Sequence, residues 1–280
     1  MTLVVDSGST KTTWAEIESG NKFVTDGLNP HFNTDAMVMK RCADVRRYFN
    51  IENSSTKIFF YGAGCGDTIQ ASRLQSLLQS AFKTEDVSID TDMLGACRSA
   101  NINGPSLVGI LGTGSNACYY EDDRIAMKSP SLGYILGDEG SANHVGRIML
   151  KKYLNDNLDK ELKNLFHDDY PYIYEEWMHR IYHCGNANRF LASLATFVVK
   201  HQDKKECEGI IHDVLEEWLS SQLCYLISRT HCKKLYVIGG FAKAIEQTLK
   251  EIMTNHGIEI TNVVGNPIDG LMKYHSSKNS

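Results

Sequence analysis

The sequence DSGSTKT at residues 6–12 directly follows an apolar run at residues 3–5. An apolar run that ends in a carboxylate predicts a buried strand, and the glycine and hydroxyl residues after it predict a tight turn. Two interpretations are open for this turn. It is either an ordinary hairpin connection or a loop whose backbone N–H groups bind phosphate, with Lys11 supplying charge.

The residues around this turn predict a three-stranded meander followed by alternating helices and strands. Alternation and turn residues place the strands of the meander at residues 3–6, 12–17 and 22–25. Helical spacing then predicts helices at residues 34–49 and 68–82, with strands at residues 57–61 and 87–90.

A similar pattern begins again near residue 106. An apolar run at residues 107–111 leads into the loop GTGSN at residues 112–116, and strands are predicted at residues 117–120 and 124–127. An offset of 106 residues aligns Ser7-Gly8-Ser9 with Thr113-Gly114-Ser115 and also superposes the apolar runs. This self-similarity predicts a duplicated unit. The alternative is that two unrelated hairpins share Gly and Ser in their turns.

The second half of the chain is mainly helical in pattern. Residues 143–232 place apolar side chains three and four apart, after which a strand is predicted at residues 234–238. Gly239 and Gly240 interrupt the pattern before a helix at residues 242–253, and a last helix follows Pro267. Strands interleaved with helices predict an α/β fold, and two similar halves suggest a cleft between them.

Composition excludes several classes of protein. The chain has 280 residues and 42% hydrophobic content, enough for two domains with their own cores. A formal charge of −5, with 29 Lys and Arg in no long block, argues against nucleic-acid or membrane-surface binding. No apolar run is long enough to span a membrane, and Asp6 interrupts the place of a secretory signal. We therefore expect a cytoplasmic protein whose partner is a small molecule or another protein.

Eight cysteines occur without a CxxC pair and without a ligand-like cluster with histidines. Neither a structural zinc site nor an iron–sulfur site is indicated. Most of these cysteines are expected to be buried thiols that pack as small hydrophobic side chains.

Three glycine loops could bind a phosphate chain, at residues 7–12, 112–116 and 239–240. Each follows an apolar strand, and glycine allows the backbone to approach a ligand closely. None matches the Walker pattern GxxxxGK[ST] or GxGxxG. A single loop of this kind is weak support, but three in order, the third opening a helix, favour nucleotide binding.

Three acidic residues lie at the ends of predicted elements. Asp6 closes the first strand, Asp92 begins a helix in DTDMLG, and Asp138 lies in the glycine-flanked turn GDEGS. Phosphoryl transfer to a hydroxyl needs a carboxylate to accept the proton and an anionic anchor for the metal. For Asp92 and Asp138 the alternative is capping, because Asp is favoured at helix N-termini.

The ordered motifs DSGSTKT, TDMLGA, GTGSNA, GDEGSA and VIGGFAKA resemble those of the ASKHA superfamily, which contains sugar kinases, actin and heat-shock chaperone ATPases. Within it the chain is most similar to the branch of N-acetylglucosamine kinases and BadF/BadG/BcrA/BcrD ATPases. The resemblance implies two ribonuclease-H-like α/β domains with a nucleotide cleft between them. Their expected bounds are residues 1–105 and 106–266, the first completed by a C-terminal helix at residues 267–280.

The resemblance also implies roles for individual residues. Asp92 matches the catalytic base of the family, and Asp6 is expected to hold Mg²⁺ through water. Asn29 and Asp138 match residues that contact the sugar. The residues that match nucleotide-binding positions are Ser9, Thr10, Lys11, Thr113, Gly114, Gly239 and Gly240.

These matches predict an ATP-dependent kinase that phosphorylates the primary hydroxyl of an amino sugar. N-acetylglucosamine, glucosamine and N-acetylmuramic acid all stay open, because Gly133 and Tyr134 replace a family tryptophan near the sugar. The alternatives are a nucleotide-gated ATPase that activates a partner enzyme and a non-catalytic binding domain. A homodimer is also open, since Trp177 and Trp218 on apolar helical stripes suit an interface or a core.

Overall fold

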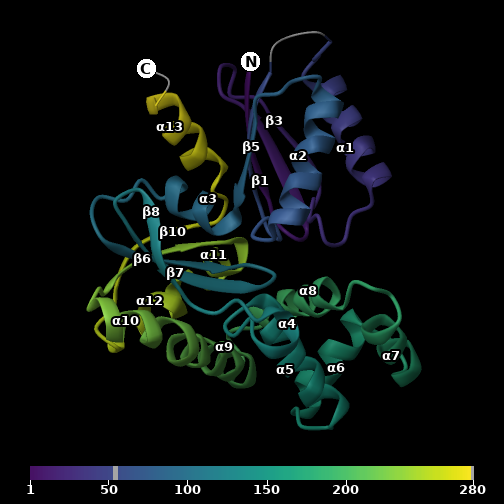
Figure 1. Ribbon diagram of the computed structural model, residues 1–280. Helices are drawn as coiled ribbons and strands as arrows, with labels where there is room; N and C mark the ends of the chain where they lie inside the picture. The colour runs from purple at the N-terminus through teal and green to yellow at the C-terminus, as the bar shows by residue number, and fades with distance from the viewer. Residues whose placement is uncertain (53–55, 279–280) are drawn as a thin grey trace. The chain divides into compact units, whose positions relative to one another are not determined.

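The computed structural model describes residues 1–52 and 56–278, and the chain divides into two compact units. Unit 1 comprises Met1–Asn103 and Asn266–Ser280, whereas unit 2 is the continuous segment Gly104–Gly265. Each unit contains one five-stranded sheet with helices packed on it (Figure 1). The predicted mixed α/β class is confirmed.

The sheet of unit 1 has the order β3-β2-β1-β4-β5. Its strands are β1 (Thr2–Ser7), β2 (Lys11–Glu16), β3 (Lys22–Asp26), β4 (Lys57–Gly62) and β5 (Val87–Thr91). The first three strands form the predicted antiparallel meander, while β4 is parallel to both β1 and β5. The carboxyl ends of β1, β4 and β5 therefore lie along one edge of the sheet.

Alternation along β1 buries both faces of this sheet. Leu3 and Val5 belong to a core that also contains buried residues of helices α1 (Asp35–Tyr48) and α2 (Thr68–Phe82). Val4 belongs to a second core with Ile268 and Leu271 of helix α13 (Ile268–Lys278). Helix α3 (Asp92–Ser99) packs against α13, and in Figure 1 both lie on the face opposite α1 and α2.

Helix α13 is fixed to the sheet by polar as well as apolar contacts. His275 is buried, stacks on Phe59, and its Nε2 lies 2.8 Å from the hydroxyl of Tyr61. Arg98 of α3 donates to the same hydroxyl at 2.9 Å and pairs with Asp90 at 3.2 Å. The last segment of the chain thus completes the unit formed by the first.

The sheet of unit 2 has the order β10-β9-β6-β7-β8, which repeats the connectivity of unit 1. Its strands are β6 (Ser106–Leu111), β7 (Ser115–Glu121), β8 (Arg124–Lys128), β9 (Lys234–Ile238) and β10 (Glu259–Val264). The last hairpin pairs are Ser7 with Thr12 and Leu111 with Ser115. The last paired residues of β1 and β6 are therefore 104 residues apart and their partners on β2 and β7 are 103 apart, because the second hairpin loop is one residue shorter. The predicted constant offset of 106 is wrong, since the small residues of the two loops align in more than one register.

Unit 2 has a long run of helices between β8 and β9 and two further helices between β9 and β10. They are α4 (Gly133–Leu136), α5 (Ala142–Leu154), α6 (Lys160–Asp169), α7 (Tyr174–Tyr182), α8 (Ala187–Lys200), α9 (Lys205–Trp218), α10 (Cys224–Thr230), α11 (Gly240–Ala244) and α12 (Glu246–Asn255). A π-helical turn, η1 (Leu219–Leu223), joins α9 to α10. Trp177 and Trp218 are fully buried in the core of this unit, so both belong to the core and not to an exposed interface stripe.

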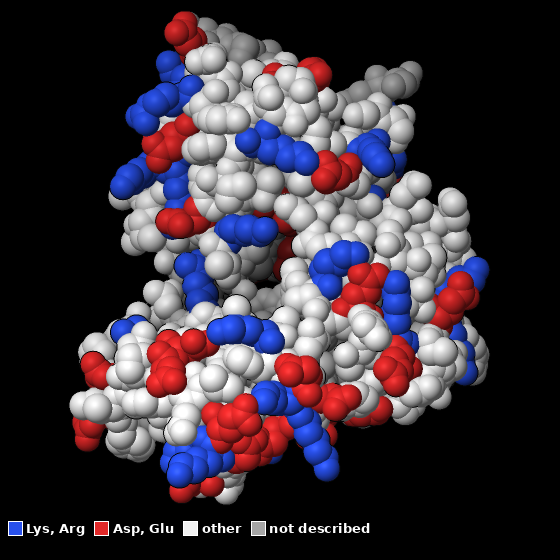
Figure 2. All heavy atoms as spheres, turned by 180° about the vertical axis from the view of Figure 1, so that it is seen from behind, with Lys and Arg blue, Asp and Glu red and all other residues white. Residues whose placement is uncertain are grey.

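The surface charges, the cysteines and the helix lengths can be compared with the expectations from composition. Figure 2 shows Lys and Arg side chains interspersed with Asp and Glu on the face it presents. Five of the eight cysteines are buried, and all eight are free thiols, which confirms the expected role of most of them as packing residues. Over residues 1–52 and 56–278, no helix is long and apolar enough to cross a membrane. The same residues contain no cluster of three or more potential metal ligands of the His, Cys, Asp and Glu types.

Candidate active site

The first glycine loop connects the antiparallel strands β1 and β2, so DSGSTKT does form a hairpin turn. Gly8 N–H donates to Lys11 O at 3.0 Å and closes the turn. At its base the hydroxyls of Ser7 and Thr12 lie 2.7 Å apart and are buried. Thr10 and Lys11 are exposed at its tip. A rigid base with an exposed polar tip is compatible with both interpretations of the loop.

The segment that carries Asn29 packs directly on this loop. Gly27 donates to Thr10 O at 3.0 Å, and a Cβ atom at residue 27 would lie 2.4 Å from Ser9 O. Leu28 N–H donates to the hydroxyls of both Ser7 and Thr12. The structure therefore brings Asn29 next to the first loop, as a substrate residue beside a phosphate loop would require.

Asn29 is buried and is held by its own local contacts. Its backbone N–H donates to Asn33 Oδ1 at 2.8 Å, and its Oδ1 accepts from His31 N–H at 3.0 Å. Gly64 comes close to the same oxygen, since a Cβ atom there would lie 2.5 Å away. These contacts fix the orientation of the amide before any ligand binds.

Asp6 and Asp92 lie at the same edge of the unit 1 sheet. Asp6 pairs with Tyr61 of β4, Tyr61 pairs with Asp90 of β5, and Asp92 begins α3 directly after β5. Burial above all, together with the nearby Asp92 carboxylate, raises the pKa of Asp6 to about 7, although Lys11 acts to lower it. Burial also raises the pKa of Asp92, against hydrogen bonds from backbone N–H groups that lower it. Two carboxyl groups with raised pKa values at one edge are typical of a functional site.

The structure bears out part of the helix-start alternative for Asp92, which lies in the first turn of α3 but is not its N-cap. Thr91 is the N-cap of α3, because its hydroxyl accepts from Leu94 N–H at 3.2 Å. Asp92 occupies the first turn, where its Oδ1 accepts from the N–H of Met93 at 2.9 Å. The second carboxylate oxygen is then the one that could accept a proton from a substrate.

The second loop and Asp138 form one cluster in unit 2. Gly112 N–H donates to Gly114 O at 2.9 Å, and Ser115 N–H donates to Asp138 Oδ1 at 3.2 Å. A Cβ atom on Gly114 would lie 2.7 Å from Asp138 Oδ2. Asp138 adopts a left-handed backbone conformation with φ of 58°, and Ser141 is the N-cap of α5 in its place. The capping alternative for Asp138 is therefore wrong.

The start of α5 and the third loop both hold the second loop in place. Asn143 N–H donates to Thr113 O at 3.1 Å. Gly239 has φ of 136°, and a Cβ atom there would lie 2.1 Å from Leu111 O, so only glycine fits. Gly240 begins α11. The second loop, the third loop and Asp138 are thus neighbours within unit 2.

Gly133 and Tyr134, which replace the family tryptophan near the sugar, lie in the short helix α4. Gly133 has φ of 70°, and Tyr134 O accepts from Arg147 at 3.0 Å. Neighbouring Ile135 and Leu136 are 72% and 74% exposed. A backbone hydrogen bond therefore anchors the segment before Asp138, while the side chains of Ile135 and Leu136 are exposed to solvent.

Several polar residues of unit 2 were missed by the sequence analysis. Glu139, His144 and Gln222 all contact the segment around Asp138, and His144 and Gln222 are buried. The sequence did contain one indication of Gln222. This residue lies four positions after the buried Trp218, so it is a polar residue on an apolar helical stripe.

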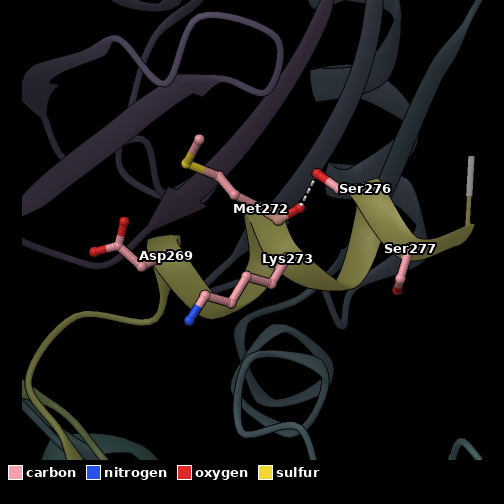
Figure 3. A pocket seen from close by; sticks show the side chains of 5 residues that line it. All are labelled: Asp269, Met272, Lys273, Ser276 and Ser277. Atoms are coloured by element: carbon pink, nitrogen blue, oxygen red, sulfur yellow. Dashed lines mark hydrogen bonds between the residues drawn. The ribbon is translucent and has the colours of Figure 1, made fainter.

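One surface depression, of about 510 Å³, is separate from these residues. Figure 3 shows the five side chains of α13 that line it: Asp269, Met272, Lys273, Ser276 and Ser277. Ser276 donates to Met272 O at 2.8 Å, which closes a bond within the helix itself. No predicted site residue lines this depression.

Comparisons with known proteins bear on this arrangement. The chain matches no family model and no curated protein. Among solved structures it is similar to a provisionally named N-acetylglucosamine kinase from Porphyromonas gingivalis, with a TM-score of 0.92 and 29% identity over 100% of both chains. A provisionally named N-acetylglucosamine kinase from Chromobacterium violaceum gives a TM-score of 0.74 and 17% identity over 98% of each chain.

A third similar structure is a ROK family glucokinase from Streptomyces griseus, solved with glucose and AMPPNP. Its TM-score is 0.61 at 12% identity, over 99% of this chain and 100% of that one. The chain has the fold of sugar kinases and actin-like ATPases. The predicted resemblance to this superfamily, and to N-acetylglucosamine kinases within it, is confirmed as a structural likeness.

Proposed function

We propose that this chain is an ATP-dependent sugar kinase that transfers phosphate to the primary hydroxyl of an amino sugar, N-acetylglucosamine first among the candidates. The observation that carries the proposal is the placement of Asp6 and Asp92 at one sheet edge, beside the hairpin loop that contains Lys11. The similarity to sugar kinases over the whole chain supports the same reaction class.

The residues present fit a magnesium nucleotide. Asp6 offers the carboxylate oxygens that Mg²⁺ prefers, and burial raises the pKa of this carboxyl group, which a bound cation would lower. The loops at residues 8–11 and 112–114, which contain Ser9, Thr10 and Thr113, are the proposed phosphate-binding segments. When bound, the magnesium nucleotide supplies the phosphoryl group that is transferred.

Asp92 is the proposed general base. It accepts the proton of the sugar hydroxyl as that oxygen becomes bonded to phosphorus, and its raised pKa gives it the proton affinity for this task. The N–H of Met93 orients the carboxylate by donating to Oδ1, and the other oxygen is the proposed proton acceptor.

Asn29 and Asp138 are the proposed sugar-binding residues of unit 1 and unit 2. Because Asn29 Oδ1 already accepts from His31, a sugar hydroxyl would meet the amide nitrogen. Asp138 Oδ1 accepts from Ser115 N–H, which orients the carboxylate that we propose binds a sugar hydroxyl. Lys11, Gly114, Gly239 and Gly240 complete the proposed nucleotide-binding set.

The test is an ADP-release assay with Mg-ATP against N-acetylglucosamine, glucosamine, N-acetylmuramic acid and glucose, with a control that contains no sugar. The expected result is ADP release that depends on an amino sugar, with a 6-O-phosphorylated product identified by NMR. ADP release at the same rate without any sugar would contradict the proposal and favour a nucleotide-gated ATPase.

A further inference from the structure

The long helical run of unit 2 contains one irregular turn. Between α9 and α10, the N–H of Cys224 donates to the carbonyl of Leu219, five residues earlier, in the π-helical turn η1. A π turn inserts one extra residue into an α-helix, is rare, and is found often at functional sites. It changes which side chains of the run face the interior of the unit.

The turn buries a glutamine that contacts two loops of the candidate site. Gln222 is only 4% exposed. Its amide nitrogen donates to Ser115 Oγ at 3.0 Å and to Glu139 Oε2 at 3.1 Å. Ser115 lies in the predicted phosphate loop at residues 112–116, and Glu139 directly follows Asp138. The two hydrogens of one amide group therefore connect these loops.

Ser115 completes the connection through its own donors. Its hydroxyl donates to the carbonyl of Glu139 at 2.6 Å, and its backbone N–H donates to Asp138 Oδ1 at 3.2 Å. The amide of Gln222 must present nitrogen to this pair, because a flipped amide would place its oxygen against the Glu139 carboxylate. Its own oxygen is buried and has no hydrogen-bond partner among the described residues.

The preceding turn of the helix packs on the same two segments. A Cβ atom at Gly109 of β6 would lie 2.5 Å from Trp218 Cζ2. A Cβ atom at Gly140, in the loop that follows Glu139, would lie 2.5 Å from Trp218 Cβ. One face of the helical run thus fits the strand that leads into the phosphate loop and the loop of Asp138.

We infer that Gln222 is a positioning residue that holds the loop at residues 112–114 and the Asp138 loop in a single arrangement. The inference rests on the proposed function, which gives these loops their ligands. Without the two amide donors, the bonds from Ser115 to Glu139 O and to Asp138 Oδ1 still connect the two loops. The backbone N–H groups of the phosphate loop and the Asp138 carboxylate are then held less firmly in their relative positions.

The experiment compares Gln222→Met, which keeps the side-chain volume but removes both donors, with Ser221→Ala. Ser221 is an exposed residue of the same turn whose hydroxyl donates to Glu217 O at 2.7 Å. Affinity for Mg-AMPPNP is measured calorimetrically without sugar, and Tm is measured for each protein. Loss of two hydrogen bonds is expected to weaken AMPPNP binding about tenfold in Gln222→Met, with no change in Ser221→Ala.

A second pair of variants tests the contact itself. Gln222→Glu places two carboxylates together and is expected to bind AMPPNP more weakly than Gln222→Met. Adding Glu139→Gln reverses donor and acceptor, and should regain at least half of the lost binding free energy. No recovery in this double variant would overturn the inference. So would a Gln222→Met protein whose Tm falls while its AMPPNP affinity stays within twofold.

These readouts separate the inference from the proposed function. If the wild-type protein binds AMPPNP but phosphorylates no sugar, the kinase proposal fails while the comparison of affinities still decides the role of Gln222. A wild-type protein that does not bind AMPPNP overturns both.

Discussion

Gly114 leaves no room for a side chain beside Asp138. A Cβ atom on residue 114 would lie 2.7 Å from Oδ2 and 2.9 Å from Oδ1 of that carboxylate. A predicted phosphate-binding residue and a predicted sugar-binding residue are therefore in contact within unit 2. A change at one of them must disturb the other.

This contact predicts a double effect of Gly114→Val. The side chain should displace the Asp138 carboxylate and also obstruct the approach of phosphate, so the KM for both ATP and sugar should rise by about tenfold or more. Gly112→Ala is the matched control for phosphate approach alone, because a Cβ atom there has its nearest neighbour 4.0 Å away. Unchanged sugar KM in Gly114→Val would contradict the coupling.

Asp92→Asn should remove the proposed general base while keeping the shape of the side chain. We expect kcat to fall by about 10² to 10⁴, with affinities for AMPPNP and sugar close to those of the wild type. Initial rates and calorimetric titrations would measure the two effects.

The control for this variant is Asp90→Asn, two residues earlier. Asp90 lies on β5, its carboxylate pairs with Arg98 at 3.2 Å, and it has no role in the proposed reaction. Its kcat should stay within a few fold of the wild-type value. Near-normal kcat in Asp92→Asn would assign the base to another residue.

The raised pKa of Asp6 predicts a pH-dependent magnesium requirement. With a pKa of about 7, the carboxyl group is mostly ionised at pH 8 and mostly protonated at pH 6. Since Mg²⁺ binds the ionised form, its apparent affinity should be about tenfold weaker at pH 6 than at pH 8. Steady-state rates at varied Mg²⁺ would measure this. An ordinary Asp, with a pKa near 3.8, would give no such change. Asp6→Asn should need more Mg²⁺ at both pH values and lose the dependence.

His275 predicts a loss of stability in acid. Burial, with Arg98, Lys278 and Lys57 nearby, lowers its pKa from 6.5 to about 4 in the folded protein. The unfolded chain therefore binds a proton below pH 6.5 that the folded chain does not accept until about pH 4. The contribution of neutral His275 to the free energy of unfolding is fully present above pH 6.5 and is lost as the pH falls toward 4.

Urea unfolding of the wild type and of His275→Gln would measure this effect. Relative to the variant, the wild type should lose about 2 kcal/mol of unfolding free energy between pH 7 and pH 5. Parallel pH dependence of the two proteins would mean that His275 protonates freely in the folded state.

The sequence predicted those features that depend on short-range pattern. Apolar alternation and the turn residues predicted the meander at the start of each unit, and glycines at residues 114 and 239 marked close backbone approaches. The same pattern could not decide whether residues 6–12 bind phosphate, because a hairpin turn and a phosphate loop require the same residue types. The alternative that Asp138 caps a helix was wrong, because its left-handed backbone conformation cannot be recognised from the sequence.

Long-range contacts account for what was missed. The role of Gln222 depends on a π turn that no apolar periodicity reveals, and on partners more than 80 residues away in the sequence. The offset between the units was misplaced by two or three residues, because small residues in a loop align equally well in several registers. The proposed site roles stay predictions that the variants above can test.

The return of α13 to unit 1 has a consequence for how the protein is made. Unit 2 is one continuous segment, so it can fold as soon as Gly265 has left the ribosome. Unit 1 begins at Met1 but has to wait for Ile268 and Leu271 to cover Val4. The unit that begins first is thus the last to be finished, and until α13 is made the sheet face at Val4 lacks the cover of Ile268 and Leu271.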